Sequence, residues 1–263
     1  MTDDPHVVLA TSRLRKEFGG VCAVDDVDLE VRRGTITALI GPNGAGKTTV
    51  FNLITGNYDA TRGSVTFTDA ARADHSLCGL RSDRIARLGI ARTFQNIRLF
   101  GDVPTLDNVK LGLHSRTKCG ALAALLRLPA ADEERQVHIA AYHYLEFVGL
   151  ASKSHELASN LPYGEQRRLE IARALALAPS LLLLDEPAAG MNPQETEDLM
   201  ALIRRIHDFG ITVLLIEHDM RLVMGISDSI VVLDHGEVIA HGRPDEIKND
   251  PDVIRAYLGD EAV

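Results

Sequence analysis

Three short, predominantly apolar runs recur along this chain. They are Ile36–Ile40, Leu181–Leu184 and Ile211–Ile216. Runs of this length between polar segments suit strands of a parallel sheet that is buried on both faces. Because the carboxyl ends of parallel strands meet at one edge of a sheet, the residues after each run are the first candidates for a binding site.

Alternating apolar residues predict further strands outside these runs. Two of them, Val7–Leu14 and Val24–Val31, are joined through a turn at residues 18–20. Another strand is predicted at Ser64–Phe67, and a hairpin at Ile230–Ala240. The polar residues 69–89 carry no clear pattern, and one or two short helices are predicted over 244–259.

The character of the chain changes to helical periodicity over residues 96–160. Leu106 through Leu113 form one apolar face, and Ile139 through Val148 form another. This stretch predicts a small helical lobe inserted into an α/β domain. Its run Ala121–Ala130 is too short to span a membrane, and packing within the lobe is favoured over contact with a partner.

Residues 41–48, directly after the first apolar run, read GPNGAGKT. The glycines of this pattern let the backbone curl so that successive N–H groups point at phosphate oxygens. A helix predicted over Lys47–Ile54 adds the partial positive charge of its N-terminus. Lys47 would reach the β- and γ-phosphates and the Thr48 hydroxyl would bind Mg²⁺. A glycine-rich turn without a ligand is the weaker interpretation, because the strand before the loop also fits.

Acidic and basic side chains follow the other two runs. Asp185 and Glu186 end the LLLLDEP stretch, where Asp185 can hold Mg²⁺ and Glu186 can align and deprotonate an attacking water. His218 follows the third run and could touch the γ-phosphate. A lone histidine is more often structural, but the position at a strand end favours a functional role here. Gln95, predicted to end a short strand Ile90–Gln95, could ligate Mg²⁺ or the water.

Two other positions are ambiguous from the residues alone. The Phe18 ring can stack on a base or pack in the core, and the two interpretations are about equal. The LPYGE stretch at 161–165 precedes a strongly helical segment, and Gly164 lies just before that helix, whose N-terminus could face an anion.

Composition narrows the class of protein. The chain has 263 residues, 45% hydrophobic and 25% charged, which fits one large α/β domain with a smaller lobe. Its net charge of −9 disfavours a broad nucleic-acid surface. Three scattered cysteines and no metal-ligand motif argue against disulfides and a protein-held transition metal. No signal peptide or membrane-spanning run is present, which favours the cytoplasm.

The order of these motifs resembles the ATP-binding subunit of an ABC transporter across nearly the whole chain. The motifs are the loop at 41–48, Gln95, LPYGE at 161–165, LLLLDEP with the AAGMN turn at 181–192, and His218. The resemblance implies an α/β P-loop NTPase fold, a mixed-sheet ABC ATPase core with an inserted α-helical subdomain. It further implies ATP and Mg²⁺ as cofactors.

The resemblance also implies domain boundaries. Residues 1–95 and 161–263 would form the ATP-binding core with antiparallel strands at its N-terminus. Residues 96–160 would form the helical subdomain, against which the helix at 164–178 packs.

Roles for individual residues follow from the same resemblance. Glu186 would be the catalytic base, His218 the switch histidine and Lys47 a further catalytic residue. Mg²⁺ would be bound by Thr48, Gln95 and Asp185. Tyr163, Gly164 and Glu165 would contact the ATP of a facing subunit rather than this chain's own ATP. The nucleotide itself would contact Phe18, Val24, Gly41, Pro42, Asn43, Gly44, Ala45, Gly46, Lys47, Thr48, Thr49 and Gln95.

Within the family, several stretches look most like the ATPase subunits of branched-chain amino acid importers. They include KEFGGVCAVDDVDL, YGEQRRLEIARAL, DEPAAGMNP and NDPDVIRAYLG. The expected partners are a second ATPase subunit, membrane-spanning permease subunits and, indirectly, a substrate-binding protein, with no nucleic acid. The expected location is the cytoplasmic face of the membrane.

Several positions depart from the family pattern. In the signature, Pro162 stands in place of the usual serine, Tyr163 in place of the first glycine and Glu165 in place of the glutamine, and Asn192 replaces an aspartate. Pro162 removes a hydroxyl that would bond the partner's γ-phosphate. A homodimeric ATPase of a lipid or lipopolysaccharide exporter is the second interpretation. A soluble ATPase acting on nucleic acid or a regulator with a dead site fits less well, because one loop and all catalytic residues are present.

Overall fold

Two β-sheets and a set of helices make up the structure, a computed structural model that describes residues 6–114 and 130–258. The larger sheet has six strands in the order β10-β9-β3-β8-β7-β6. Neighbouring strands are parallel except for the antiparallel pair β9 and β10. Its strands are β3 (Ile36–Ile40), β6 (Ile90–Arg92), β7 (Leu181–Asp185), β8 (Thr212–Ile216), β9 (Ser229–Asp234) and β10 (Glu237–Gly242).

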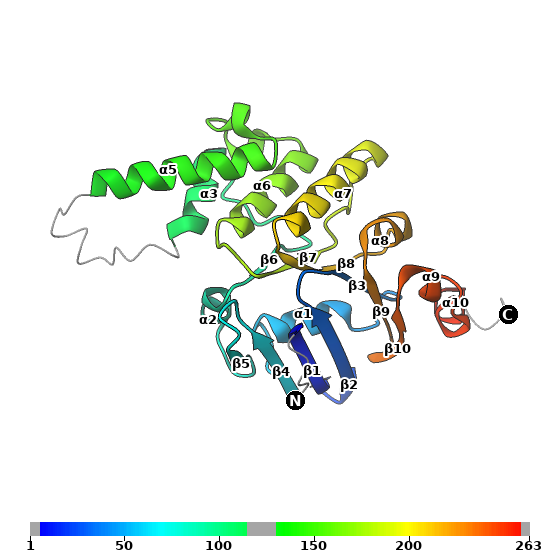
Figure 1. The fold of residues 1–263 in the computed structure, drawn as a ribbon. Coiled ribbons are helices and arrows are strands. Elements are labelled where there is room, and N and C mark those ends of the chain that lie inside the picture. Colours follow the sequence, from blue (N-terminus) through cyan, green and yellow to red (C-terminus); the bar gives the residue numbers. More distant parts are fainter. Residues whose placement is uncertain (1–5, 115–129, 259–263) are drawn as a thin grey trace.

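The smaller sheet is antiparallel, with four strands in the order β2-β1-β4-β5. These strands are β1 (Val7–Phe18), β2 (Val21–Arg32), β4 (Arg62–Thr68) and β5 (Asp74–Ser76). Helix α1 (Lys47–Ile54) lies between the two sheets in Figure 1. Its apolar side chains share one buried cluster with both sheets, so the helix is fixed on two sides.

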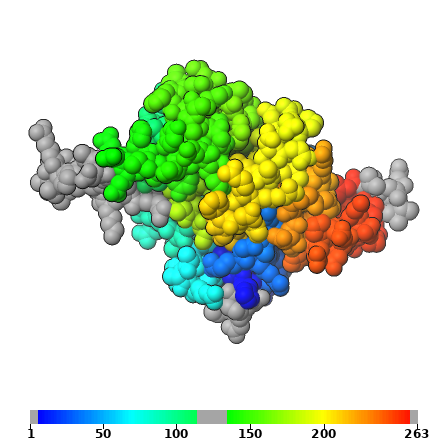
Figure 2. All heavy atoms as spheres, turned by 45° about the horizontal axis from the view of Figure 1, so that its top comes forward, coloured from blue at the N-terminus to red at the C-terminus, as the bar shows by residue number. Residues whose placement is uncertain are grey.

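Helices cover the opposite face of the six-stranded sheet (Figure 1). They are α3 (Thr105–His114), α5 (Ala130–Phe147), α6 (Tyr163–Leu175), α7 (Pro193–Asp208) and α8 (Met220–Ile226). A second buried cluster joins them to the sheet. Helices α3, α5 and α6 also pack on one another, and α5 projects from the body of the molecule in Figure 2.

Short elements complete the fold. Helix α2 (Ser82–Leu88) precedes β6, and α9 (Pro244–Ile247) and α10 (Pro251–Leu258) follow β10. Two 3-10 turns, Ala151–Lys153 and Ala158–Asn160, lead into α6. No helix among the described residues combines the length and the apolar character needed to cross a membrane.

The predicted α/β fold class is confirmed, and the buried strands were predicted almost to the residue. Residues 36–40 of β3 and 212–216 of β8 are buried at every position, as expected of strands covered on both faces. Strands β1 and β2 are longer than predicted. The polar segment 69–89, which carried no clear pattern, contains β5 and α2.

Two predictions about local structure are wrong, and a third concerns residues that the structure does not describe. Strand β6 ends at Arg92, so Gln95 lies in the loop beyond it and not at a strand end. Gly164 lies inside the first turn of α6 rather than before it, because Pro162 takes the N-cap position. The run Ala121–Ala130 falls, except for its last residue, outside the described residues.

Of the three cysteines, Cys22 and Cys78 are free thiols, and Cys119 falls outside the described residues.

Candidate phosphate-binding site

The candidate residues meet because three parallel strands end at the same edge of the sheet. The loop 41–46 follows β3, Glu186 follows β7, and Glu217 and His218 follow β8. Strand β8 lies between the other two, with Ile216 opposite both Leu39 and Asp185. The register therefore brings segments that are far apart in the sequence into one row.

The loop after β3 has the curled backbone that its glycines predict. Gly41, Gly44 and Gly46 all adopt positive φ, at +147°, +85° and +100°. A Cβ on Gly46 would lie 2.4 Å from the carbonyl oxygen of Ala23 and 3.5 Å from Val24 Cγ2. The loop is thus pressed against β2, and only glycine fits at this point of contact.

Lys47 is held against this loop. Its Nζ donates to the carbonyl oxygens of Gly41 and Pro42, both at 2.7 Å, and the residue is 8% exposed. Burial lowers the pKa of the Lys47 ammonium, and the nearby carboxylates of Glu186 and Asp185 partly oppose that shift. The ammonium therefore faces the acidic side of the site from the loop, where a phosphate could displace its carbonyl partners.

Asp185 has one carboxylate oxygen bonded and one free. Its Oδ2 accepts a hydrogen bond from Arg92 Nη2 at 2.7 Å, whereas the buried Oδ1 has no partner among the described residues. A buried carboxylate oxygen without a partner is costly, and oxygen ligands of this kind suit Mg²⁺. The donor set, with the exposed residue Thr48 in the first turn of α1, fits a metal that enters with the nucleotide.

No group of three or more histidine, cysteine or acidic side chains in residues 6–114 and 130–258 could cage a metal ion alone. Phosphate oxygens would have to complete the coordination of any metal bound here.

Glu186 stands in a strained backbone conformation beside two other predicted residues. Its φ is +44°, a region that non-glycine residues rarely adopt, and its N–H donates to the Ile216 carbonyl at 3.0 Å. Its Oε2 accepts from Gln95 Nε2 at 2.9 Å, and His218 Nδ1 lies 4.0 Å from that oxygen. Glu186, Gln95 and His218 therefore form one cluster, although Gln95 reaches it from a loop and not from a strand end.

Glu217 is an organising residue that sequence reasoning passed over. It is 1% exposed, and its carboxylate accepts backbone N–H groups from Ala188 at 2.8 Å and from His218 at 3.0 Å. Burial raises the pKa of the Glu217 carboxyl, and these hydrogen bonds oppose the shift. Its position at the end of an apolar strand was the available signal. Glu217 connects the turn after Glu186 to the segment that carries His218.

A buried ion pair on α6 holds the Gln95 segment and was also missed. Arg167, fully buried, donates to the carbonyl oxygens of Phe94 at 2.5 Å and Gln95 at 2.7 Å. Its partner Glu170, 2.9 Å away, accepts the N–H groups of Phe94 and Arg98 at 3.3 Å. Burial raises the pKa of the Glu170 carboxyl. Helix α6 therefore binds both carbonyl oxygens and N–H groups of this loop.

The LPYGE residues lie at the start of α6, outside this cluster. Tyr163 is 44% exposed, and its hydroxyl accepts from Arg167 Nη2 at 3.2 Å. Glu165 pairs with Lys153 at 2.6 Å. Gly164 faces Glu195 of α7, whose Oε1 would lie 2.7 Å from an added Cβ. This chain alone therefore does not bring the LPYGE residues to its own phosphate loop.

Phe18 and Asn192 occupy defined positions of their own. The Phe18 ring, 41% exposed, makes an edge contact with Tyr58 at 5.2 Å between centroids, and Lys16 Nζ lies 4.9 Å from its centroid. The ring is thus partly exposed, as stacking on a base requires. Asn192 caps α7, with its side chain accepting the Glu195 N–H at 3.0 Å.

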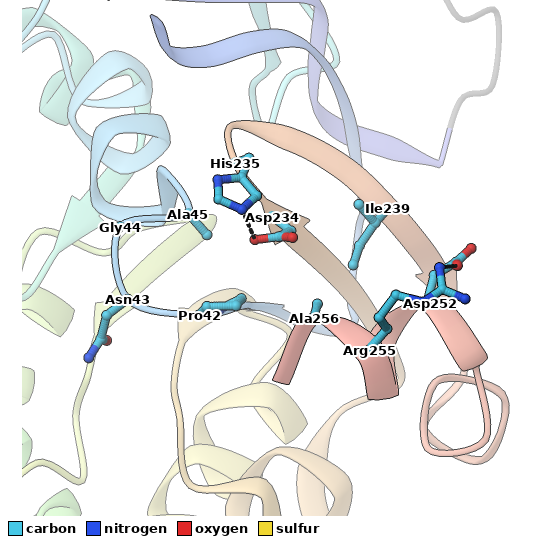
Figure 3. A pocket seen from close by; sticks show the side chains of 10 residues that line it. All are labelled: Pro42, Asn43, Gly44, Ala45, Asp234, His235, Ile239, Asp252, Arg255 and Ala256. Carbon is cyan, nitrogen blue, oxygen red and sulfur yellow. Dashed lines mark hydrogen bonds and ion pairs between the residues drawn. The ribbon is translucent and has the colours of Figure 1, made fainter. Parts of the chain in front are cut away.

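A hollow of about 770 Å³ lies beside the phosphate loop, between the β9–β10 turn and α10 (Figure 3). Tyr257 of α10 comes within hydrogen-bonding reach of the Gly41 backbone, and burial raises the pKa of its hydroxyl. The C-terminal helix is therefore in contact with the loop. The residues that line the hollow are Pro42, Asn43, Gly44, Ala45, Asp234, His235, Ile239, Asp252, Arg255 and Ala256.

Comparison with known proteins gives two family matches. Residues 24–189 match the family described as ABC transporter, and residues 237–263 match the family described as branched-chain amino acid ATP-binding cassette transporter. The high-affinity branched-chain amino acid transport ATP-binding protein LivG of Salmonella typhimurium is 48% identical, over 96% of this chain and 98% of LivG. The corresponding protein BraF of Pseudomonas aeruginosa is 47% identical over the same shares.

Solved structures agree with this result. A nucleotide-free ATP-binding cassette from an ABC transporter superposes with a TM-score of 0.82 at 32% identity, covering 97% of this chain and 100% of the other. An ATP-binding cassette of an ABC transporter in its ADP conformation gives the same TM-score and identity, with 97% and 99% covered.

The tight packing of the loop on β2 generates a prediction about two glycines. Gly46→Ala should destabilise the chain more than Gly44→Ala, because an added Cβ on Gly44 meets nothing within 4 Å. Both substitutions carry the cost of a positive φ, about 1 to 2 kcal/mol. Overpacking against the Ala23 carbonyl should add roughly 1 to 3 kcal/mol at Gly46. The free energies of unfolding from urea titrations test this, and equal losses would contradict it.

Proposed function

The chain belongs to the ATP-binding subunits of ABC transporters, and on that premise we propose that it drives an importer of branched-chain or related amino acids. Members of this family bind nucleotide and hydrolyse ATP. The amino acid cargo rests on one observation, the 47–48% identity to LivG and BraF over 98% of their length. The match of residues 237–263 to the branched-chain family model supports the same cargo.

In the proposed mechanism the loop and Lys47 bind the phosphates. Backbone N–H groups of the loop, which Pro42 lacks, bind phosphate oxygens, and the Lys47 ammonium leaves the carbonyls of Gly41 and Pro42 for the β- and γ-phosphates. Phe18 stacks on the adenine and Val24 packs beside it. Pro42, Asn43, Ala45 and Thr49 complete the contacts of the loop with the nucleotide.

Glu186 is the proposed general base. Its carboxylate accepts a hydrogen bond from the Gln95 side chain, and His218 Nδ1 lies 4.0 Å from the same oxygen. Both neighbours can therefore respond to whether nucleotide occupies the site. Glu186 accepts the proton of the attacking water, while His218 contacts the γ-phosphate. The left-handed backbone at Glu186 fixes the direction in which this carboxylate points.

Mg²⁺ is the proposed metal, and it would neutralise charge on the β- and γ-phosphates. The free Asp185 Oδ1 supports this proposal. Thr48 contributes its hydroxyl, and Gln95 contributes its amide oxygen, since only its nitrogen is engaged with Glu186.

A complete site is proposed to need two chains. Tyr163, Gly164 and Glu165 start α6 and are directed toward the nucleotide of a facing ATPase subunit. Pro162 cannot supply the hydroxyl that the family's serine offers, a loss of about 1 to 3 kcal/mol where a buried acceptor stays unpaired. The site that this signature completes is therefore the weaker of the two.

A hollow of about 430 Å³ is the proposed binding site for the permease subunit. It lies between α3 and α6, beside the loop that carries Phe100. We propose that the helices of residues 96–160, α3 among them, form a separate lobe. The exposed rings and chains of Phe100 (54%) and Leu111 (44%) line it, with Arg173 5.8 Å from the Phe100 centroid. An inserted element of a membrane subunit would bury them. We propose that the chain docks in this way at the cytoplasmic face of the membrane.

Removing the proposed base should stop turnover without stopping binding. Glu186→Gln should lower the rate of phosphate release from the assembled transporter by about 10² to 10⁴ and leave ATP affinity within a factor of two. Glu197→Gln, the same change on the exposed face of α7, is the control and should behave as wild type. Near-normal hydrolysis by Glu186→Gln would rule it out as the base.

The hollow lined by Phe100 and Leu111 can be tested apart from the nucleotide site. Phe100→Ala should weaken binding to detergent-solubilised permease subunits by about tenfold or more, as loss of an anchoring aromatic does at interfaces. ATP binding by the isolated chain should not change. Phe209→Ala, at a residue that is 74% exposed after α7, is the matched control. Equal effects of the two substitutions would exclude the hollow as the binding site for the permease subunit.

Self-association separates the importer from a homodimeric lipid or lipopolysaccharide exporter. The Glu186→Gln variant with ATP and Mg²⁺ should remain a monomer by light scattering, because two copies would both rely on the Pro162 signature. Addition of the second ATPase subunit should give a heterodimer. A stable homodimer would contradict the heteromeric importer and favour the exporter.

A further inference from the structure

Arg92 joins the metal-binding edge to the helix that follows the phosphate loop. It ends β6, and its side chain is 6% exposed. Nη2 donates to Asp185 Oδ2 at 2.7 Å. Nη1 donates to Asn52 Oδ1 at 2.8 Å and to Thr55 Oγ1 at 2.9 Å. One guanidinium therefore bridges β7 and α1, from a strand that carries none of the predicted site residues.

Two aromatic rings pack near this guanidinium. Its central carbon lies 5.5 Å from the ring centroid of Phe51 and 5.1 Å from that of Phe94. Phe51 is fully buried in α1, and Phe94 belongs to the loop whose backbone Arg167 of α6 binds. Because three acceptors hold Nη1 and Nη2 and the rings pack nearby, the side chain has little freedom to rotate, although Nε has no partner among the described residues.

The consequence falls on Asp185, whose side chain is 3% exposed. Its Oδ2 is engaged by the fixed Arg92 fork, and its Oδ1 is buried without a hydrogen-bond partner in the described part of the chain. A carboxylate held by one oxygen in this way cannot turn, so the other oxygen keeps one direction. Partners that orient a metal ligand commonly matter as much as the ligand itself.

We propose that Arg92 is a positioning residue for the metal, which holds the Asp185 carboxylate so that Oδ1 faces Mg²⁺ or its bound water. This inference rests on the proposed function, since it assumes that Asp185 serves the Mg²⁺ of Mg-ATP. Arg92 touches neither the nucleotide nor the ion in this account and acts only through Asp185.

Arginine suits this position better than lysine. The planar fork reaches Asp185, Asn52 and Thr55 together, whereas an ammonium is a single point of charge on a flexible stem. The positive charge also balances the buried carboxylate when no metal is present. Orientation and charge balance are separable, because Arg92→Lys keeps the charge and loses the fork.

The test measures the Mg²⁺ requirement for nucleotide binding, with hydrolysis blocked by Glu186→Gln in every protein. A fluorescent ATP analogue is titrated into the chain in EDTA and then at increasing Mg²⁺. Arg92→Gln should raise the half-saturating Mg²⁺ concentration about tenfold, the lower end of the loss seen when partners of metal ligands are removed. Affinity in EDTA should stay within about twofold of the parent protein.

Two comparisons separate positioning from damage to the fold. Arg81→Gln removes the same charge from a side chain that is 85% exposed and should leave both titrations unchanged. Loosening of α1 alone would weaken binding in EDTA and in Mg²⁺ alike. Arg92→Lys serves if Arg92→Gln does not fold, and it should shift the Mg²⁺ requirement in the same direction by a smaller factor.

A double-mutant cycle tests the route through Asp185. Asp185→Asn should raise the Mg²⁺ requirement, and adding Arg92→Gln should raise it no further, because the two residues act as one unit. An unchanged Mg²⁺ requirement in both Arg92 variants, or a full additional shift in the double variant, would overturn the inference. Failure of the parent protein to bind ATP, or to respond to Mg²⁺ at all, would instead overturn the proposed function.

Discussion

The pairing of β8 with β3 on one side and β7 on the other is the constraint on which the site depends. Ile216 lies opposite both Leu39 and Asp185, so the phosphate loop, the acidic pair and His218 leave the sheet at one level. A slip of one residue would turn every side chain of a strand to the other face. Complete burial of β3, β7 and β8 between the two apolar clusters prevents that slip.

Buried charges organise the rest of the site by binding groups from distant segments. Arg92 pairs with Asp185, and Glu217 accepts backbone N–H groups from two segments. Arg167 and Glu170 pair with each other within α6 and together bind the backbone of the Gln95 segment. Breaking one partner of such a pair leaves a buried charge without compensation, which is more costly than the pair is favourable. These contacts therefore act chiefly to fix where each loop lies. Asp185 Oδ1 has no such partner among the described residues, and the metal that we propose to enter with the nucleotide would supply one.

Much of this arrangement follows from the sequence because its signals are local. The glycine spacing of residues 41–46 and the apolar runs before Glu186 and His218 predicted both the strands and the edge where they end. Hairpin β9–β10 was equally clear. Local sequence patterns could not predict the role of Arg92, because its partner Asp185 lies 93 residues away. The same holds for Arg167, whose backbone acceptors are about 72 residues away on an irregular loop. Strand β5 and α2 escaped prediction because polar segments on the surface lack apolar periodicity.

A structure of the Glu186→Gln variant crystallised with ATP and Mg²⁺ tests the central claim most directly, namely that this sheet edge is the nucleotide site. The account predicts that the phosphates lie in the curl of residues 41–46, that Lys47 Nζ has left the Gly41 and Pro42 carbonyls, and that the metal lies on the side of Asp185 Oδ1. Phosphates bound elsewhere, or bound there while Lys47 keeps both carbonyl bonds and the metal avoids Asp185, would contradict it.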